Sequence, residues 1–242
     1  MSTAAKFQSP SFSKNVIVIV GGFGSGKSEV SVNLAQHLAR TTDGPVAIAD
    51  LDVVNPYFRS REAAEPLKAL GIKSLVPPGE RAQADLPIVI PEIKGAILAP
   101  EGKLILDVGG DNAGATVLKS LADAFEPGAY ELLLTVNAYR PFTADVDGAL
   151  KMLSEIESAC GLKFSGLISN SHLIEQTTTE EVLHGIDLTE QVSRRTDLPI
   201  CFVSVANDIL AALDPRRVPY PVLAINRLLL KPWERSPSTE TD

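Results

Sequence analysis

A glycine-rich loop is the part of this sequence best suited to chemistry. Residues 20–31 read VGGFGSGKSEVS, and four of them satisfy the pattern G-x-x-x-x-G-K-[ST]: Gly21, Gly26, Lys27 and Ser28. Glycines let backbone amides converge on phosphate oxygens, and the start of the following helix adds partial positive charge. Lys27 is expected to meet the β and γ phosphates and Ser28 to ligate magnesium. The pattern therefore predicts a loop that holds a nucleoside triphosphate.

The residues expected to contact the phosphates run without interruption through this loop. They are Gly21, Gly22, Phe23, Gly24, Ser25, Gly26, Lys27, Ser28 and Glu29. A glycine-rich turn between strand and helix without any ligand is the alternative, and the flanking apolar run and helical pattern argue against it.

Carboxylates are needed beside such a loop to hold magnesium and to place water. Asp107 closes the apolar run KLILD, Asp50 closes the run AIAD, and Asp52 lies two residues further on. A carboxylate at the end of a buried strand is costly unless it meets a metal or a donor. We therefore predict Asp50 and Asp107 as metal ligands, with a capping or turn role as the alternative. The two roles are equally compatible with Asp52.

The elements that must position these groups follow from hydrophobic patterning. Continuous apolar runs without alternation predict strands that helices cover on both faces. They lie at 15–20, 45–50, 103–108, 130–136, 164–169 and 199–205. Helical patterns occur between them, at 28–40, 143–159 and 178–195. This alternation predicts an α/β fold, a doubly wound and mostly parallel sheet in a three-layer P-loop NTPase.

The chain is expected to form one nucleotide-binding domain at 14–234. The small polar residues at 1–13 and 235–242 predict disordered ends. The proline-interrupted stretch at 76–100 predicts an ordered but irregular excursion. The segment 222–233, VLAINRLLLKPW, is similar to a tail helix that binds membranes, but it has few cations and is expected to dock on the body instead.

Composition and net charge restrict the expected partners and location of the protein. The net charge of -8 and the pI near 5.0 disfavour binding to nucleic acid and to anionic membranes. Two cysteines without CxxC spacing, no signal peptide and no membrane-spanning run predict a cytoplasmic location.

The motifs together resemble those of the SIMIBI class of P-loop NTPases, and of its MinD/ParA-like ATPases in particular. The matching stretches are GGFGSGKS, ADLDVVN, LILDVGGDNAG, TVNAYRPFTADVDGA and GLISN. With NPYFRSRE they also resemble small bacterial ATP-binding proteins. The resemblance implies that Lys27 and Ser28 bind phosphate and magnesium and that Asp50 and Asp107 support the metal. It also implies that Asp52 orients the attacking water and that Asn170 contacts the base.

One position departs from the sequence pattern of the MinD/ParA-like ATPases. Gly22 stands where their loop has a lysine that reaches the nucleotide of a partner subunit. A nucleotide-dependent homodimer is therefore left open. Arg59 and Arg61 follow the Asp52 loop and could supply a cation in its place, or they could lie solvated at a helix start.

The expected ligand is ATP with Mg²⁺. Guanine is commonly recognised through N-K-x-D, and NSHL at 170–173 lacks the aspartate, which favours adenine. The leading hypothesis is a slow ATPase that acts as a switch on an unknown protein partner. The alternatives are a small-molecule kinase or ATP-dependent ligase, a GTPase, and a module that holds ATP without cleaving it.

Overall fold

The computed structural model of the chain describes residues 7–52, 67–75 and 90–228. The described strands form one sheet in the order β3-β2-β4-β1-β5-β6-β7-β8, and every neighbouring pair is parallel. The strands are β1 (Val16–Gly21), β2 (Val46–Asp50), β3 (Lys73–Ser74), β4 (Lys103–Gly109), β5 (Tyr130–Val136), β6 (Gly166–Ser169), β7 (Ile200–Ala206) and β8 (Val222–Ile225). The doubly wound parallel sheet expected from the apolar runs is thus confirmed.

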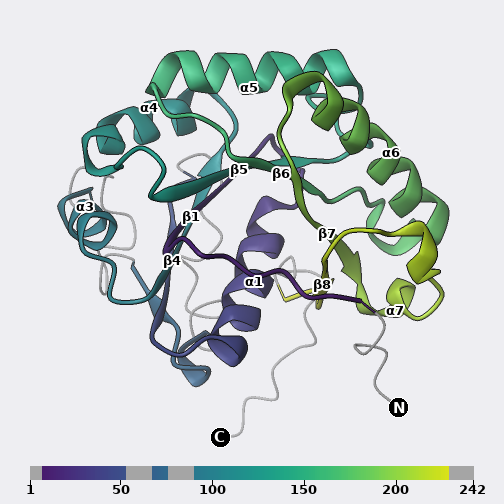
Figure 1. Ribbon diagram of the computed structural model, residues 1–242, viewed down its shortest axis with the longest axis horizontal. Helices are drawn as coiled ribbons and strands as arrows, with labels where there is room; N and C mark the ends of the chain where they lie inside the picture. Colours follow the sequence, from purple (N-terminus) through teal and green to yellow (C-terminus); the bar gives the residue numbers. More distant parts are fainter. Residues whose placement is uncertain (1–6, 53–66, 76–89, 229–242) are drawn as a thin grey trace, which may run out of the picture.

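Helices cover both faces of this sheet (Figure 1). Helix α1 packs on one face, and α4, α5 and α6 pack on the other. The helices are α1 (Lys27–Thr41), α3 (Ile90–Leu98), α4 (Asn112–Leu121), α5 (Val146–Cys160), α6 (Thr179–Thr196) and the short α7 (Asn207–Leu210), with 3-10 turns η4 (Ala122–Ala124), η5 (Ile174–Gln176) and η6 (Pro215–Arg217). The molecule therefore has the three layers of an α/β/α sandwich.

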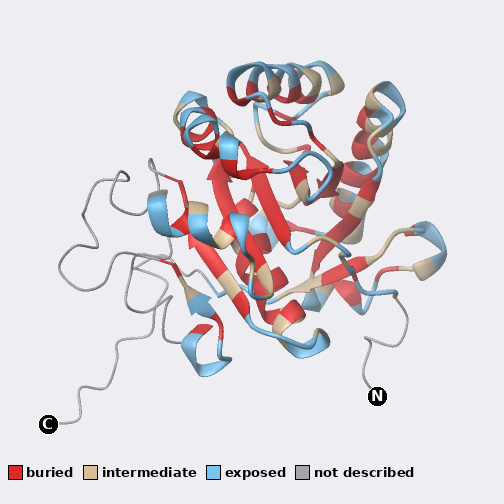
Figure 2. Ribbon diagram, turned by 60° about the vertical axis from the view of Figure 1, so that its left-hand side comes forward, coloured by how far each residue is buried: buried red, intermediate tan, exposed pale blue. Residues whose placement is uncertain are grey.

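The continuous apolar runs are explained by burial on both faces of the strands (Figure 2). In β1, Val16, Val18 and Val20 face the α4 and α5 side, whereas Ile17 and Ile19 face α1. Because successive side chains alternate between faces, both sets must be apolar. The same alternation in β2 and β4 turns Asp50 and Asp107 toward α1, where the glycine-rich loop ends.

Two expectations about the ends of the domain differ from the structure. Residues 7–13, expected to be disordered, lie against the body: the Phe12 ring meets Phe202 edge-on, and the Gln8 carbonyl accepts a hydrogen bond from Val222 N at 2.7 Å. The apolar rings override the small polar residues around them. The segment resembling a tail helix instead begins as strand β8, because its apolar residues pair with β7.

The proline-rich excursion is helical in its last part. Residues 90–98 form α3, and Ile93 is fully buried against the sheet. Pro91 is compatible with this helix because it lies at its second residue, where its missing N–H has no partner inside the helix. Residues 76–89 lie outside the described part of the chain, as do Arg59 and Arg61.

Candidate nucleotide-binding site

The glycine-rich loop has the backbone of a phosphate cradle. Gly24 and Gly26 adopt φ of 75° and 84°, the left-handed region in which a side chain is strained. Gly26 is also the N-cap of α1 and offers no side chain to the first amides of the helix. Those amides, with the positive end of the helix, are suited to bind an anion.

The carboxylates lie at the adjacent ends of β2 and β4. Asp50 and Asp107 are direct neighbours in the parallel register, and both are buried. The Ser28 hydroxyl donates to Asp107 Oδ2 at 2.5 Å, and Asp52 N donates to Asp50 Oδ1 at 2.9 Å. The sequence-predicted metal residues Ser28, Asp50 and Asp107 are therefore brought together.

This donor set suits magnesium. Mg²⁺ binds hard oxygen ligands and usually uses one or two carboxylates together with substrate phosphates and water. Within the described residues no group of three or more His, Cys, Asp or Glu forms a metal cluster, so a purely protein-built site is not what this chain offers there. The residues fit a metal that arrives with a nucleotide.

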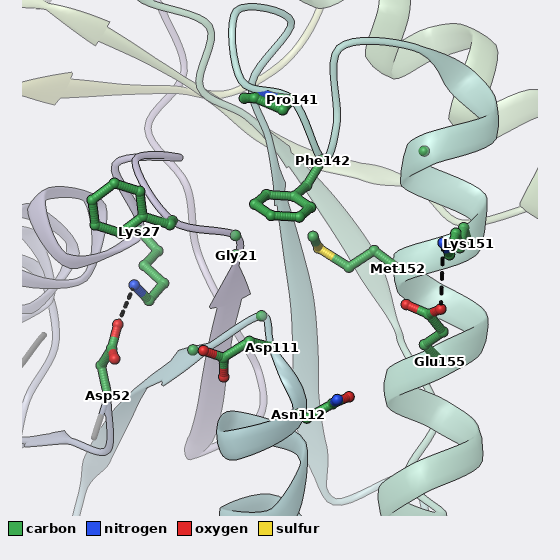
Figure 3. A pocket seen from close by; sticks show the side chains of 15 residues that line it. Gly21, Lys27, Asp52, Asp111, Asn112, Pro141, Phe142, Lys151, Met152 and Glu155 are labelled. Carbon is green, nitrogen blue, oxygen red and sulfur yellow. Dashed lines mark ion pairs between the residues drawn. The ribbon is translucent and has the colours of Figure 1, made fainter. Parts of the chain in front are cut away.

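Lys27 is held by an acidic partner inside the site. Its ammonium lies 2.6 Å from Asp52 Oδ2, and both side chains are buried (Figure 3). The two residues predicted to be catalytic are thus in direct contact. The predicted role of Lys27 in phosphate binding would require it to exchange this carboxylate for phosphate oxygens.

Burial and charge shift the pKa values in opposite ways. Burial raises the pKa of Asp107 to about 7; the ammonium of Lys27 opposes this, and Asp50 adds to it. Burial by itself lowers the pKa of Lys27, but the carboxylates of Asp107, Asp52 and Asp50 outweigh it, and the pKa is raised. The lysine therefore stays charged, and a cation that bound Asp107 would displace its proton to solvent.

Two side chains from neighbouring strand ends hold the outside of the loop. The Asn170 amide donates to Ser25 O at 2.7 Å and accepts from the Ser204 hydroxyl at 2.6 Å. Arg140 Nε donates to Gly24 O at 2.7 Å. In this structure Asn170 braces the loop, and its contact with a base stays a prediction. Sequence reasoning missed Arg140; the available signal was an arginine four residues beyond a buried strand.

His172 lies beside the same end of the loop. A Cβ on Gly26 would come close to both His172 Nε2 and the Asn170 amide nitrogen. Burial, together with the charges of Arg140 and Arg227, lowers the pKa of His172 to about 4. The imidazole is consequently neutral near pH 7 and can take part in hydrogen bonds without adding charge.

A cavity of about 420 Å³ opens next to the Lys27–Asp52 pair (Figure 3). Its walls come from the loop, from the residues after β4, and from the start of α5. Phe142 and Met152 close over Gly22, where a Cβ would approach their carbon atoms at 3.1 to 3.3 Å. The place of the MinD/ParA lysine is thus covered by apolar side chains.

The glycines after β4 touch the loop directly. Gly110 N donates to Gly21 O at 2.9 Å, and a Cβ on Gly110 would run into the backbone of residues 21 and 22. Asp111 then caps α4 by accepting from Gly114 N. A shift of the glycine-rich loop would therefore displace the residues at the start of α4.

Comparison with known proteins supports the fold. No family model matches the sequence, and no curated protein matches it significantly. Among solved structures, FtsY from Mycoplasma mycoides superposes with a TM-score of 0.53 at 20% identity, covering 80% of this chain and 62% of that one. Chloroplast FtsY from Physcomitrella patens gives 0.54 at 16% identity, covering 88% and 66%. FtsY from Thermotoga maritima gives 0.55 at 17% identity, covering 87% and 69%.

These similarities, with the loop and the parallel sheet, decide the architecture. The chain has the α/β P-loop NTPase fold that the FtsY structures share. It spans less than two thirds of the length of the first FtsY structure and about two thirds of the second. None of the described helices is both long enough and apolar enough to cross a membrane.

Proposed function

We propose that this protein is a magnesium-dependent ATPase that acts as a slow nucleotide-driven switch. The observation that carries the proposal is the meeting of Lys27 and Ser28 from the loop with the carboxylates at the ends of two adjacent strands. Local pattern alone explains the loop, but a structural role does not require three buried carboxylates around it. Phosphoryl transfer requires this combination.

Each group has a part in hydrolysis. The loop amides and Lys27 bind the phosphates and stabilise the negative charge that develops on them. A bound Mg²⁺ would be held by Ser28, Asp50 and Asp107 and would neutralise phosphate charge. When Lys27 turns to the phosphates, Asp52 would accept a hydrogen bond from a water molecule and orient it for attack.

The base belongs to the proposal as well. Leu173 stands where guanine-binding sequences have an aspartate, and this favours adenine. One FtsY structure with the same fold, from Elizabethkingia anophelis, is described as a complex with GDP, so GTP is the alternative that must be tested beside ATP.

A switch needs a structural element whose position changes when the nucleotide binds. The contact between Gly110 and Gly21 joins the loop to α4, so occupation of the loop would alter the surface around α4. We propose that an unknown cytoplasmic protein, or a second copy of this chain, binds that surface. A nucleic-acid or membrane partner is disfavoured by the negative net charge.

The cavity supports a second candidate, a kinase or ligase for a small molecule. The cavity beside Asp52 measures about 420 Å³ and extends from the loop to Phe142 and Met152, which is more than one attacking water requires. Cavities of this size accept small organic ligands. In that case Asp52 would take the proton of an acceptor hydroxyl instead of orienting a water.

Phosphate release by the purified protein tests the proposal. We expect slow turnover of Mg·ATP, weaker or no turnover of Mg·GTP, and loss of activity in Lys27→Ala. Lys163→Ala is the matched control, because Lys163 is exposed and pairs with Glu157 just before β6, at the opposite edge of the sheet.

The outcomes separate the candidates. Turnover that a small acceptor stimulates would support the kinase, and turnover that only a protein stimulates would support the switch. If wild-type protein neither binds nor cleaves either nucleotide, the proposed function is wrong.

A further inference from the structure

Two consecutive carbonyl groups of the phosphate loop are held from outside. Arg140 Nε donates to Gly24 O and the Asn170 amide donates to Ser25 O, each at 2.7 Å. The two side chains come from the segments that follow β5 and β6. The loop is therefore pinned at successive peptide units by residues far away in the sequence.

Holding these carbonyls also sets the direction of two amides. In a planar trans peptide the C=O and the following N–H point in opposite directions. A carbonyl of Gly24 turned outward to Arg140 thus turns the Ser25 N–H toward the inside of the loop. Ser25 N indeed donates across the loop to Gly22 O at 3.0 Å. This hydrogen bond closes the turn, so Arg140 stabilises the shape of the loop. The contact of Asn170 with Ser25 O turns the next N–H, that of Gly26, toward the inward side, on which loop amides cradle phosphates.

Arg140 is itself held firmly. Its NH1 donates to Tyr139 O at 2.9 Å, and its backbone N donates to Asn137 O at 3.1 Å. The Asn137 side chain accepts from Tyr139 N, which stiffens the same turn. A guanidinium fixed by a rigid turn loses little entropy when it orients a neighbour.

The charge of Arg140 remains available to an anion. Across the described ranges 7–52, 67–75 and 90–228, no acidic oxygen lies within 4.0 Å of its guanidinium. Its field reaches His172, whose pKa it helps to lower. A cation that polarises the Gly24–Ser25 peptide also strengthens the hydrogen bond from Ser25 N to Gly22 O, which closes the turn of the loop.

We propose that Arg140 is a positioning residue of the nucleotide site. It fixes the Gly24–Ser25 peptide, and with it the turn closed by the hydrogen bond from Ser25 N to Gly22 O, so that the loop has its binding shape before the nucleotide arrives, and it adds positive charge next to the loop. The inference rests on the proposed function, because it assumes that the loop binds a nucleoside polyphosphate. It assigns a role to a residue outside the glycine-rich pattern.

Nucleotide titration of Arg140 variants tests this role. The probes are fluorescent analogues of ATP and GTP with Mg²⁺, used with full-length protein, and the nucleotide that wild type binds more tightly is carried forward. For Arg140→Ala we expect a Kd about tenfold higher or more, since hydrogen bonds from charged donors are strong. Arg140→Lys keeps the charge and can reach one carbonyl, so we expect it to recover part of the affinity.

Two controls separate positioning from general damage. Arg194→Ala removes an exposed arginine near the end of α6 and should leave the Kd unchanged. The melting temperature without nucleotide should stay within about 2 °C of wild type in all three variants, because a partly exposed surface side chain contributes little to global stability.

The inference is overturned if Arg140→Ala binds the probe as tightly as Arg194→Ala does, or if Arg140→Lys binds no better than Arg140→Ala. Failure of the proposed function would look different, because wild-type protein itself would then bind neither probe.

Discussion

At the scale of single residues, the ion pair between Lys27 and Asp52 is expected to affect nucleotide binding most directly. The pair is buried and the two charged groups are 2.6 Å apart. In the proposed function, a nucleotide would have to break this pair before Lys27 could reach a phosphate. The same carboxylate would, in the proposed function, oppose binding first and support hydrolysis afterwards.

Asp52→Asn should separate these two effects. We expect Mg-nucleotide affinity to increase several-fold, because Lys27 is no longer held by a charge, and phosphate release to fall at least about 100-fold, because the group that orients water is lost. Fluorescence titration and phosphate release measure the two. Asp187→Asn, an exposed residue of α6, should change neither. Weaker binding by Asp52→Asn would contradict the expectation.

Asp107 should make the nucleotide-free protein less stable as pH rises. Its pKa is raised from 3.8 to about 7, so between these values the folded state binds more protons than the unfolded state. The free energy of unfolding then falls with rising pH across this window, by up to about 1.4 kcal/mol per pH unit. Asp107→Asn removes this contribution to the pH dependence of the free energy of unfolding.

Urea denaturation at pH 5 and pH 8, without Mg²⁺, measures the effect. We expect Asp107→Asn to gain stability over wild type at pH 8 and to gain much less at pH 5. An equal difference at the two pH values would argue against a raised pKa at this carboxyl group.

At the scale of elements, the junction between β1 and α1 carries most of the binding geometry. Gly26 is the last residue before α1, has φ of 84°, and packs against Asn170 and His172. The junction therefore joins a local backbone requirement to contacts from β6. A side chain at this position would disturb both.

Gly26→Ala should abolish nucleotide binding, and Gly161→Ala is its matched control. Gly161 has φ of 78° at the end of α5, but a Cβ there meets no atom within 4 Å. Both changes should cost about 1 to 2 kcal/mol of backbone strain. Gly26→Ala should cost more, because its Cβ collides with the Asn170 amide. Denaturation and nucleotide titration measure the pair, and normal binding by Gly26→Ala would contradict the geometry.

At the scale of the whole molecule, the N-terminal segment ties the sheet to α1 far from the nucleotide site. Lys103 Nζ donates to Phe12 O and Lys14 O, and Pro10 O lies 3.0 Å from His37 Nε2. These contacts gather at the edge of the sheet where the strands begin. The candidate nucleotide site lies at the carboxyl ends of the strands, on the opposite side of the sheet. Changes in stability and changes in nucleotide binding should therefore be separable.

Phe12→Ala should lower the free energy of unfolding by roughly 1 to 3 kcal/mol, because its ring packs edge-on against the buried Phe202. Nucleotide affinity of the folded protein should not change. Leu98→Ala, which removes an exposed apolar side chain, should alter stability by no more than about 0.5 kcal/mol. A change of Kd in Phe12→Ala would show that the two edges are coupled.

The sequence by itself determined the features that depend on neighbouring residues. The loop from Gly21 to Ser28 is recognisable because a local sequence pattern encodes its turn and the start of its helix. Asp50 and Asp107 could be predicted as partners because parallel strands bring their carboxyl ends to a common edge. The unbroken apolar runs predicted a doubly covered sheet, since strands buried on both faces leave no polar alternation.

Only the tertiary structure decided which distant side chains meet this loop. Arg140, Phe142 and Met152 reach it because β5 lies directly beside β1, a neighbour relation that the order of residues does not contain. Strand β8 and the ordered residues 7–13 depend in the same way on pairing and packing with β7. Such contacts gain their free energy from burial against elements that are remote in the sequence. A short segment therefore has no local sequence pattern from which they could be predicted.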